Sequence, residues 1–207
     1  PAGIRALVRD LTVERCRIEN NGESFGAGSR LIGNSGESFA VLNSVTAGNA
    51  GFGSVVNGFF TRDGAADEQI RNATITGCTI EKNGFEGIDL DSVDSLAIDD
   101  CTVRGNGGSG VEFDGDAVDL AVTGTTIADN GVAGLTAPEN EIADALIENC
   151  TIANNFFGGI EFEAVDGLTI RDSTIEGNLD GVTDPEEFIE PAGVRALVRD
   201  LTVERSR

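Results

Sequence analysis

The sequence contains no histidine, tryptophan, tyrosine or methionine, and these absences remove several classes of function. Without histidine the chain lacks the usual general base, so Ser-His-Asp and Cys-His catalysis are excluded within these 207 residues. Without tryptophan or tyrosine, a sugar-binding surface would lack its usual stacking platform, and the 11 phenylalanines are the only aromatic residues. No apolar run approaches the roughly 18 residues of a membrane span, so we expect no membrane insertion in this segment.

Basic residues are also scarce, with 14 against 36 acidic residues, and Lys82 is the only lysine. The net charge of −22 excludes nucleic acid as a default partner, because both would be strongly anionic. Two interpretations of the acidic residues remain. Either the acidic residues form a solvated surface suited to high salt, where their mutual repulsion is screened, or they cluster to bind cations. The acidic, nearly lysine-free composition resembles that of halophilic archaeal proteins.

One pattern recurs about every 24 residues: apolar, x, apolar, x, x, small, x, apolar, x, x, Asn. Its copies begin at Leu11, Phe39, Ala73, Leu96, Leu120, Ala145 and Leu168, and Leu201 opens an eighth. The period-2 alternation predicts short strands with one inward face, and no segment carries the helical period of 3.6. A further strand headed by glycine follows the asparagine, as at Gly87 and Gly110.

Three short strands per repeat predict an all-β fold, a right-handed parallel β-helix of about seven to eight coils forming one domain over residues 1–207. Each strand should pair with its counterparts about 4.8 Å above and below. Stacking turns the repeated asparagines into an internal ladder that satisfies turn groups. The four cysteines fall in one inward column with serine and threonine, so we expect free buried thiols. A Cys78–Cys101 disulfide is conceivable on adjacent coils, although in-register strands disfavour its geometry.

The pattern Ile-x-x-Cys/Ser/Thr-x-Ile-x-x-Asn-Gly-x-x-Gly-Ile resembles the right-handed parallel β-helix repeat of the pectate-lyase-like superfamily, including its carbohydrate-binding and sugar-hydrolase repeat modules. The resemblance covers nearly the whole chain and is closest over residues 70–178. It implies the fold and leaves the activity open, because this repeat occurs in lyases, hydrolases, epimerases, viral spikes and surface proteins.

Acidic residues concentrate on the third strand of each coil. The candidates for Ca²⁺ ligation are Asp89, Asp91, Glu112, Asp114, Glu161 and Glu163. The alternation predicts that Asp89, Glu112, Thr136 and Glu161 point outward in one row. Such a row is either screened by salt or bridged by Ca²⁺, a hard cation that takes oxygen ligands. We expect no cofactor to be required, with Ca²⁺ as the open alternative.

The resemblance implies that a catalytic groove, if present, lies on the outer face of the first strands. Only Asp99, Glu148 and Arg171 could do acid–base work there. Asp99 and Glu148 should lie two coils apart, about 9.6 Å by strand spacing. That distance is too wide for a retaining carboxylate pair and near the limit of an inverting one. The catalytic motifs of pectate lyases, polygalacturonases and alginate epimerases are not recognisable, so the sequence favours a module without catalysis.

A longer period links the two ends of the chain. Residues 1–17 recur at 191–207 with differences only at Ile4/Val194 and Cys16/Ser206. We expect a tandem block of 190 residues within a longer protein, with both ends of this chain lying inside the solenoid, and head-to-tail or tandem copies as partners. In the last coil, the third strand is predicted at Gly193–Ala196.

These observations favour a non-catalytic extracellular or cell-surface module of a halophile that acts as a spacer, fibre or adhesive element. The first alternative is a carbohydrate-binding or carbohydrate-active module that recognises a polysaccharide. The second is a module that binds Ca²⁺ without sugar.

Overall fold

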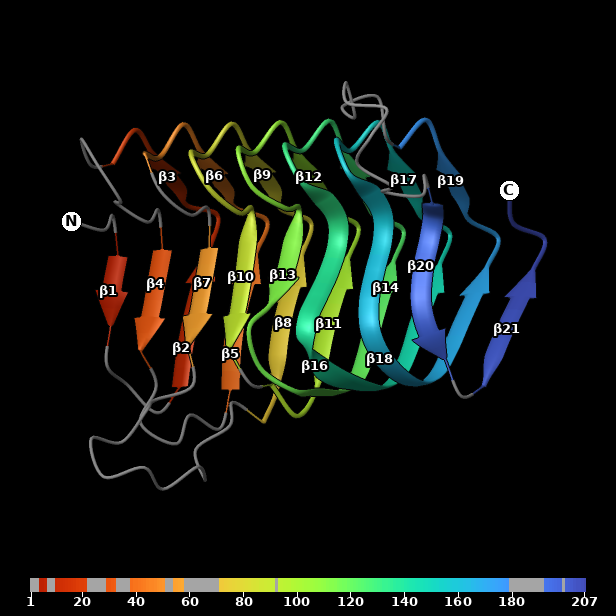
Figure 1. Cartoon of the computed structure of the whole chain (residues 1–207). Coiled ribbons are helices and arrows are strands. Elements are labelled where there is room, and N and C mark those ends of the chain that lie inside the picture. The colour runs from red at the N-terminus through yellow and green to blue at the C-terminus, as the bar shows by residue number, and fades with distance from the viewer. Residues whose placement is uncertain are drawn as a thin grey trace.

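Short strands separated by tight turns wind the chain into a parallel β-solenoid, shown by a computed structural model in Figure 1. The structure describes residues 4–6, 10–21, 29–32, 38–50, 54–57, 71–91, 93–178, 192–198 and 200–207. The coils stack along one axis, and the first and last described strands lie at opposite ends (Figure 1). The described residues include no helix that is both long and apolar enough to cross a membrane.

Each coil contributes strands to three columns, as the repeat predicts. The first-strand column is β2 (Asp10–Glu14), β5 (Ser38–Leu42), β8 (Ala73–Thr76), β11 (Leu96–Asp99), β14 (Ala117–Thr123), the ends of β16 (Ala133–Glu148) and β18 (Gly158–Arg171), and β21 (Leu201–Glu204). The second-strand column is β3 (Arg17–Glu19), β6 (Val45–Ala47), β9 (Thr79–Glu81), β12 (Thr102–Arg104), β15 (Thr126–Ala128), β17 (Thr151–Ala153) and β19 (Thr174–Glu176). The third-strand column is β1 (Ile4–Ala6), β4 (Ser29–Ile32), β7 (Ser54–Asn57), β10 (Ile88–Asp91), β13 (Val111–Phe113), the starts of β16 and β18, and β20 (Ala192–Val198).

All pairings are parallel between neighbouring coils, which confirms the predicted all-β solenoid. Among the described residues the second column forms its own 7-stranded sheet, so the coil count differs slightly from the predicted seven to eight. The last third strand is confirmed, since β20 pairs with β18 through Ile160 and Val194.

The first and third columns join into one 14-stranded sheet, which the repeat did not predict. The join occurs because β16 and β18 continue from the third strand through the corner into the next first strand. The equivalent corner after β13 carries Asp114 and Gly115 and breaks the strand. In β16 the backbone stays extended there and adjusts by a register shift between Ala137 and Glu141.

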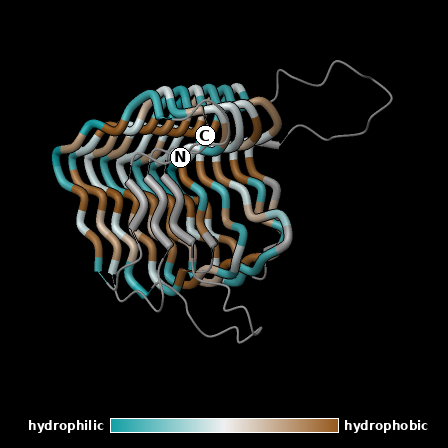
Figure 2. Tube along the Cα trace, turned by 90° about the vertical axis from the view of Figure 1, so that its left-hand side faces the viewer, coloured by the Kyte–Doolittle hydropathy of each residue, from teal (hydrophilic) through white to brown (hydrophobic). Residues whose placement is uncertain are grey.

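The core is a continuous column of aliphatic side chains inside the coils. Figure 2 shows the hydrophobic positions aligned from one coil to the next. At the third position of the sequence repeat, Val41, Ile75, Ile98, Val122, Ile147 and Ile170 are at most 1% exposed. Because each such residue packs on its counterparts above and below, the alternation seen in the sequence becomes one uninterrupted core.

The asparagine ladder links every described coil at the turn after the second strand. Asn130 Oδ1 accepts from the backbone N and Nδ2 of Asn106 at 3.1 and 3.0 Å. Its Nδ2 donates to Asn155 Oδ1 at 2.9 Å and to the Val103 carbonyl at 3.3 Å. The same asparagine-to-asparagine contact recurs from Asn21 to Asn178. Each interior asparagine side chain therefore satisfies polar groups of both neighbouring coils.

Glycine at the head of the third strand makes room for this ladder. A Cβ added to Gly134 would lie 2.5 Å from the Gly159 carbonyl oxygen and 3.0 Å from Asn155 Nδ2. At the corner between the first and second strands, backbone conformation determines the residue type. One residue of this corner adopts a left-handed conformation with φ near 50–60°. Asparagine, aspartate and glycine fill most of these corners, since they tolerate that conformation best.

Candidate functional site

The outer face of the first-strand column carries the three candidate catalytic residues. Asp99, Thr123, Glu148 and Arg171 follow one another in register on neighbouring coils, so the predicted two-coil separation of Asp99 and Glu148 is confirmed. The Thr123 hydroxyl donates a hydrogen bond to the Asp99 carboxylate. Arg171 donates from Nη2 to Glu148 at 2.9 Å, and its Nε lies 2.8 Å from the other carboxylate oxygen.

These contacts hold both candidate carboxylates to side chains of an adjacent coil. Arg171 carries a raised pKa because of its hydrogen bond and charge interaction with Glu148. An acid–base pair needs two carboxyl groups that face one substrate and exchange protons with it. Here the strand β14 separates Asp99 from Glu148, and each carboxylate is already engaged in a contact between coils.

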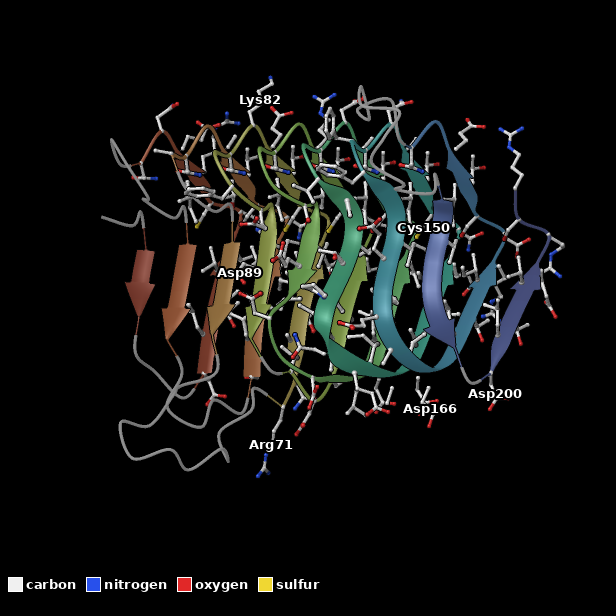
Figure 3. All side chains as sticks on the ribbon, in the orientation of Figure 1. Arg71, Lys82, Asp89, Cys150, Asp166 and Asp200 are labelled. Carbon is white, nitrogen blue, oxygen red and sulfur yellow. The ribbon has the colours of Figure 1, made fainter. Side chains whose placement is uncertain are left out.

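The third-strand acids form the row that the sequence predicts, because Asp89, Glu112, Thr136 and Glu161 are in register. The row is less solvated than expected. Asp89 and Thr136 are only 6% and 7% exposed, while Glu112 and Glu161 are half-buried. Figure 3 shows Asp89 on β10, within the broad face that the third strands form. Asp89 is therefore covered although its position in the alternation is an outward one, because alternation along a strand does not report what else covers its face.

The other candidates for Ca²⁺ ligation do not complete a cage. Asp114 and Glu163 are exposed, and the side chain of Asp91 lies outside the described residues. Within the described ranges, no three histidine, cysteine, aspartate or glutamate side chains gather in a way that could hold a metal ion. Binding of Ca²⁺ by the third-strand acids stays a prediction.

Glu86 joins this acidic group, although the repeat pattern did not predict it. Its carboxylate lies over Gly108 of the next coil, in space that a Cβ would fill. Glu86 belongs to the loop between the second and third strands, so strand alternation does not place it. The sequence offered no signal for this placement beyond the short Asn83–Gly87 loop that contains Glu86.

Burial and mutual repulsion disturb the protonation of this group. Burial raises the pKa of Glu112 to about 7, and the nearby charges of Glu86 and Asp114 contribute to this rise from its ordinary value. The pKa of Glu86 is also raised, chiefly by burial. Because the pKa of Glu112 is about 7, the charge of this face changes as the pH approaches neutrality.

Replacing Glu112 with glutamine is expected to stabilise the protein above pH 7 by about 1–2 kcal/mol, allowing for the screening of a half-buried group. Between pH 4.5 and 7 the folded state holds a proton that the unfolded state releases, so Glu112 costs stability as the pH rises through this window. The gain should vanish below pH 4.5. Denaturant unfolding at both ends of the window measures it. Glu163→Gln, at an exposed position, is the control, and an equal gain in both variants would contradict the prediction.

The cysteine column is a structural part of the core. All four cysteines are free, as predicted; Cys78, Cys101 and Cys150 are buried and Cys16 is half-buried. The buried thiols donate to backbone carbonyls, as Cys150 does to Val122 at 3.3 Å. Burial raises the pKa of Cys150, so its thiolate is disfavoured. These positions fill the inside of the corner between the first and second strands.

Comparisons with known proteins found a family match and a similar solved structure. A family described as periplasmic copper-binding protein (NosD) matches residues 54–186. A comparison with curated proteins gave no match. Among solved structures, the A-module of mannuronan C-5 epimerase AlgE6 from Azotobacter vinelandii is similar over 95% of this chain and 56% of that one, with 19% identity and a TM-score of 0.45. The chain thus spans little more than half of that structure.

Proposed function

The chain belongs to the family described as periplasmic copper-binding protein (NosD), and on this premise we propose that it is a non-catalytic β-solenoid module acting outside the cytoplasm as a spacer or surface element. The family description supports the location. The role itself is supported by what the polar residues do, because the described ladders mainly connect one coil to the next.

The observation that carries the proposal is the engagement of the candidate acid–base residues. Glu148 is bound to Arg171 at 2.8 Å, and Asp99 accepts from Thr123. A catalytic carboxylate must reach a substrate proton. In this chain both carboxylates form contacts between neighbouring coils, as expected of residues with a structural role.

Copper, which the family description names, does not fit the donor set of this chain. Protein copper sites draw chiefly on histidine, cysteine and methionine, and the sequence has neither histidine nor methionine. The thiols of Cys78 and Cys101 are buried and donate to the carbonyls of Val41 and Ile75 at 3.2 Å inside the coil. No three potential ligands gather within the described part of the chain. We therefore assign no copper-dependent step to this module.

A second candidate function, polysaccharide binding, is favoured by a column of hydroxyls on the outer face of the second strands. Thr79, Thr102, Thr126, Thr151 and Thr174 lie in register on five successive coils. Strand pairing spaces such hydroxyls about 4.8 Å apart, so a hydroxyl-rich polymer lying along the axis would meet a regular array of donors and acceptors.

The two candidates and catalysis are separated by one set of measurements. The protein is incubated with neutral and acidic polysaccharides in high salt, with and without Ca²⁺, and both chain cleavage and co-sedimentation are recorded. A spacer gives neither signal, and binding without cleavage that Thr126→Val weakens supports the second candidate. Turnover that Asp99→Ala or Glu148→Ala abolishes would overturn a non-catalytic role. Thermal melts of both variants control for loss of structure.

A further inference from the structure

Two tripeptides of the sequence have the form Asn-x-Thr, which is an acceptor motif for N-linked glycans. They are Asn-Ala-Thr at residues 72–74 and Asn-Cys-Thr at residues 149–151. A motif of three residues is short, so it counts only where the fold presents the asparagine and the threonine together to solvent. The structure allows this to be judged for both motifs.

The fold turns the two ends of the 149–151 motif outward and its middle residue inward. Asn149 and Thr151 are exposed, whereas Cys150 is 2% exposed. Cys150 Sγ donates to the Val122 carbonyl at 3.3 Å, and Cys150 N donates to Ser173 Oγ at 3.1 Å. The alternation along the chain then places the residues on either side of this anchor on the outer face. The motif amide and the motif hydroxyl therefore face solvent together.

The Asn149 side chain is not used to pack one coil on the next. Asn149 occupies the left-handed corner between the first and second strands, with φ 53°. At the same corner of an earlier coil, Asn43 Oδ1 lies 2.6 Å from the point where a Cβ on Gly77 would be. In the coil after Asn149 this corner residue is Asp172, whose own Cβ fills the equivalent space. Among the described residues no hydrogen bond engages the Asn149 amide group of the side chain.

The hydroxyl of the motif is also unusually open. Thr151 belongs to the column of five threonines on the outer face of the second strands. Thr151 is exposed, whereas the other four are half-buried: Thr79, Thr102, Thr126 and Thr174. The threonine that completes the motif is therefore the most exposed member of its column.

The motif at residues 72–74 meets only part of this description. Asn72 is exposed and Ala73 is 2% exposed, so the alternation is the same. Thr74 is half-buried in the first-strand column, where it lies in register between Ala40 and Ala97. The hydroxyl that a modifying enzyme must reach is thus less open at this motif than at residues 149–151.

We propose that Asn149 of the folded module accepts an N-linked glycan. This modification belongs to exported proteins, so the inference rests on the location given in the proposed function. The donor is an oligosaccharide carried on a lipid phosphate. Asn149 Nδ2 forms a bond to the anomeric carbon of the first sugar, and the bond from that carbon to the phosphate oxygen breaks. The lipid phosphate leaves with the bonding electrons, and the amide nitrogen releases one proton.

The test uses the folded, purified full chain with an oligosaccharyltransferase and its lipid-linked oligosaccharide. The transferase is one that modifies a synthetic peptide of residues 145–153 under the same conditions. Every protein carries Asn72→Gln, so that any added mass reports one motif. We expect mass spectrometry to find one added oligosaccharide on the proteolytic peptide that contains Asn149. Thr151→Ser should keep the modification, and Thr151→Val should lose it.

Two further variants serve as controls. Asn149→Asp removes the acceptor nitrogen, keeps a residue that tolerates the left-handed corner, and should abolish the modification. Thr174→Val removes the neighbouring hydroxyl of the same column and should be modified as the parent is. Circular dichroism checks that each variant remains folded.

Two results would overturn the proposal. The first is a folded protein that stays unmodified at Asn149 while the unfolded chain is modified there, because the fold would then hide the motif. The second is a Thr151→Val protein that is modified as fast as the parent. Because the assay uses purified protein, either result removes the acceptor site and leaves the proposed location standing. That location is measured separately, by fractionating cells that make the protein.

Discussion

Replacing Asn130 with alanine is expected to lower the free energy of unfolding by about 3–5 kcal/mol, more than any substitution on the outer faces. Asn130 is 2% exposed, and its side chain makes four hydrogen bonds. Its removal leaves the backbone N and amide of Asn106, the Val103 carbonyl and one acceptor of Asn155 without this partner. Buried polar groups that lose a partner cost their full desolvation energy, and alanine offers no replacement.

Chemical denaturation followed by circular dichroism measures this loss. Asn21→Ala is the matched control, since Asn21 is half-buried at the first described rung of the ladder and donates through its amide to Asn49 alone in the described contacts. A loss below about 1 kcal/mol, or equal losses at Asn21 and Asn130, would show that the ladder is not a main source of stability. Asn130→Asp should be at least as destabilising as Asn130→Ala, because the buried carboxylate would face the acceptor oxygens of Val103 and Asn155.

Transfer from molar potassium chloride to low-salt buffer is expected to lower the melting temperature by about 10 °C or more. If each of the 14 basic residues paired with one acid, 36 − 14 = 22 acids would still lack a basic partner. Several bases are already committed, as in the pairs Arg104–Glu81 at 2.8 Å and Arg205–Asp172 at 2.6 Å. The remaining carboxylates repel one another over about 10 Å at 0.1 M salt, and this repulsion is relieved as the fold opens.

Melts at matched ionic strength with potassium or calcium chloride separate screening from binding. Screening predicts that both salts act alike once ionic strength is equal. Recovery at millimolar Ca²⁺ that potassium cannot reproduce would favour the Ca²⁺ interpretation of the third-strand acids, with Glu112→Gln reducing the effect. Melting curves that coincide in low and high salt would contradict both.

The fold could be predicted from the sequence because every coil repeats the same physical problem. The alternation of apolar and polar residues predicts which face of each strand is buried. An asparagine such as Asn130 recurs at the turn after the second strand, where polar groups are buried. The separation of Asp99 and Glu148 followed from the same counting. The merging of two columns through β16 and β18 did not, because it depends on whether a corner stays extended, and no residue type in β16 marks that choice.

The candidate site was less predictable because burial and pairing involve neighbours that are distant in sequence. The repeat placed Asp89 and Glu112 in one row, yet it could not show that Asp89 is covered. The repeat also treated Glu148 and Arg171 as separate candidates, whereas they form an ion pair between adjacent coils. Glu86 was missed because it belongs to a loop, where the two-residue period gives no direction.

The direction of the hydrogen bonds has a mechanical consequence. In a solenoid the bonds between parallel strands run nearly along the long axis, so a pull on the two ends loads the contacts between coils in series. Such a rod yields at its weakest junction, one coil at a time, and its strength does not grow with its length. Each released coil of about 24 residues adds roughly 80 Å of extended chain in exchange for about 4.8 Å of rod. We therefore expect the proposed spacer to lengthen under load by many small steps.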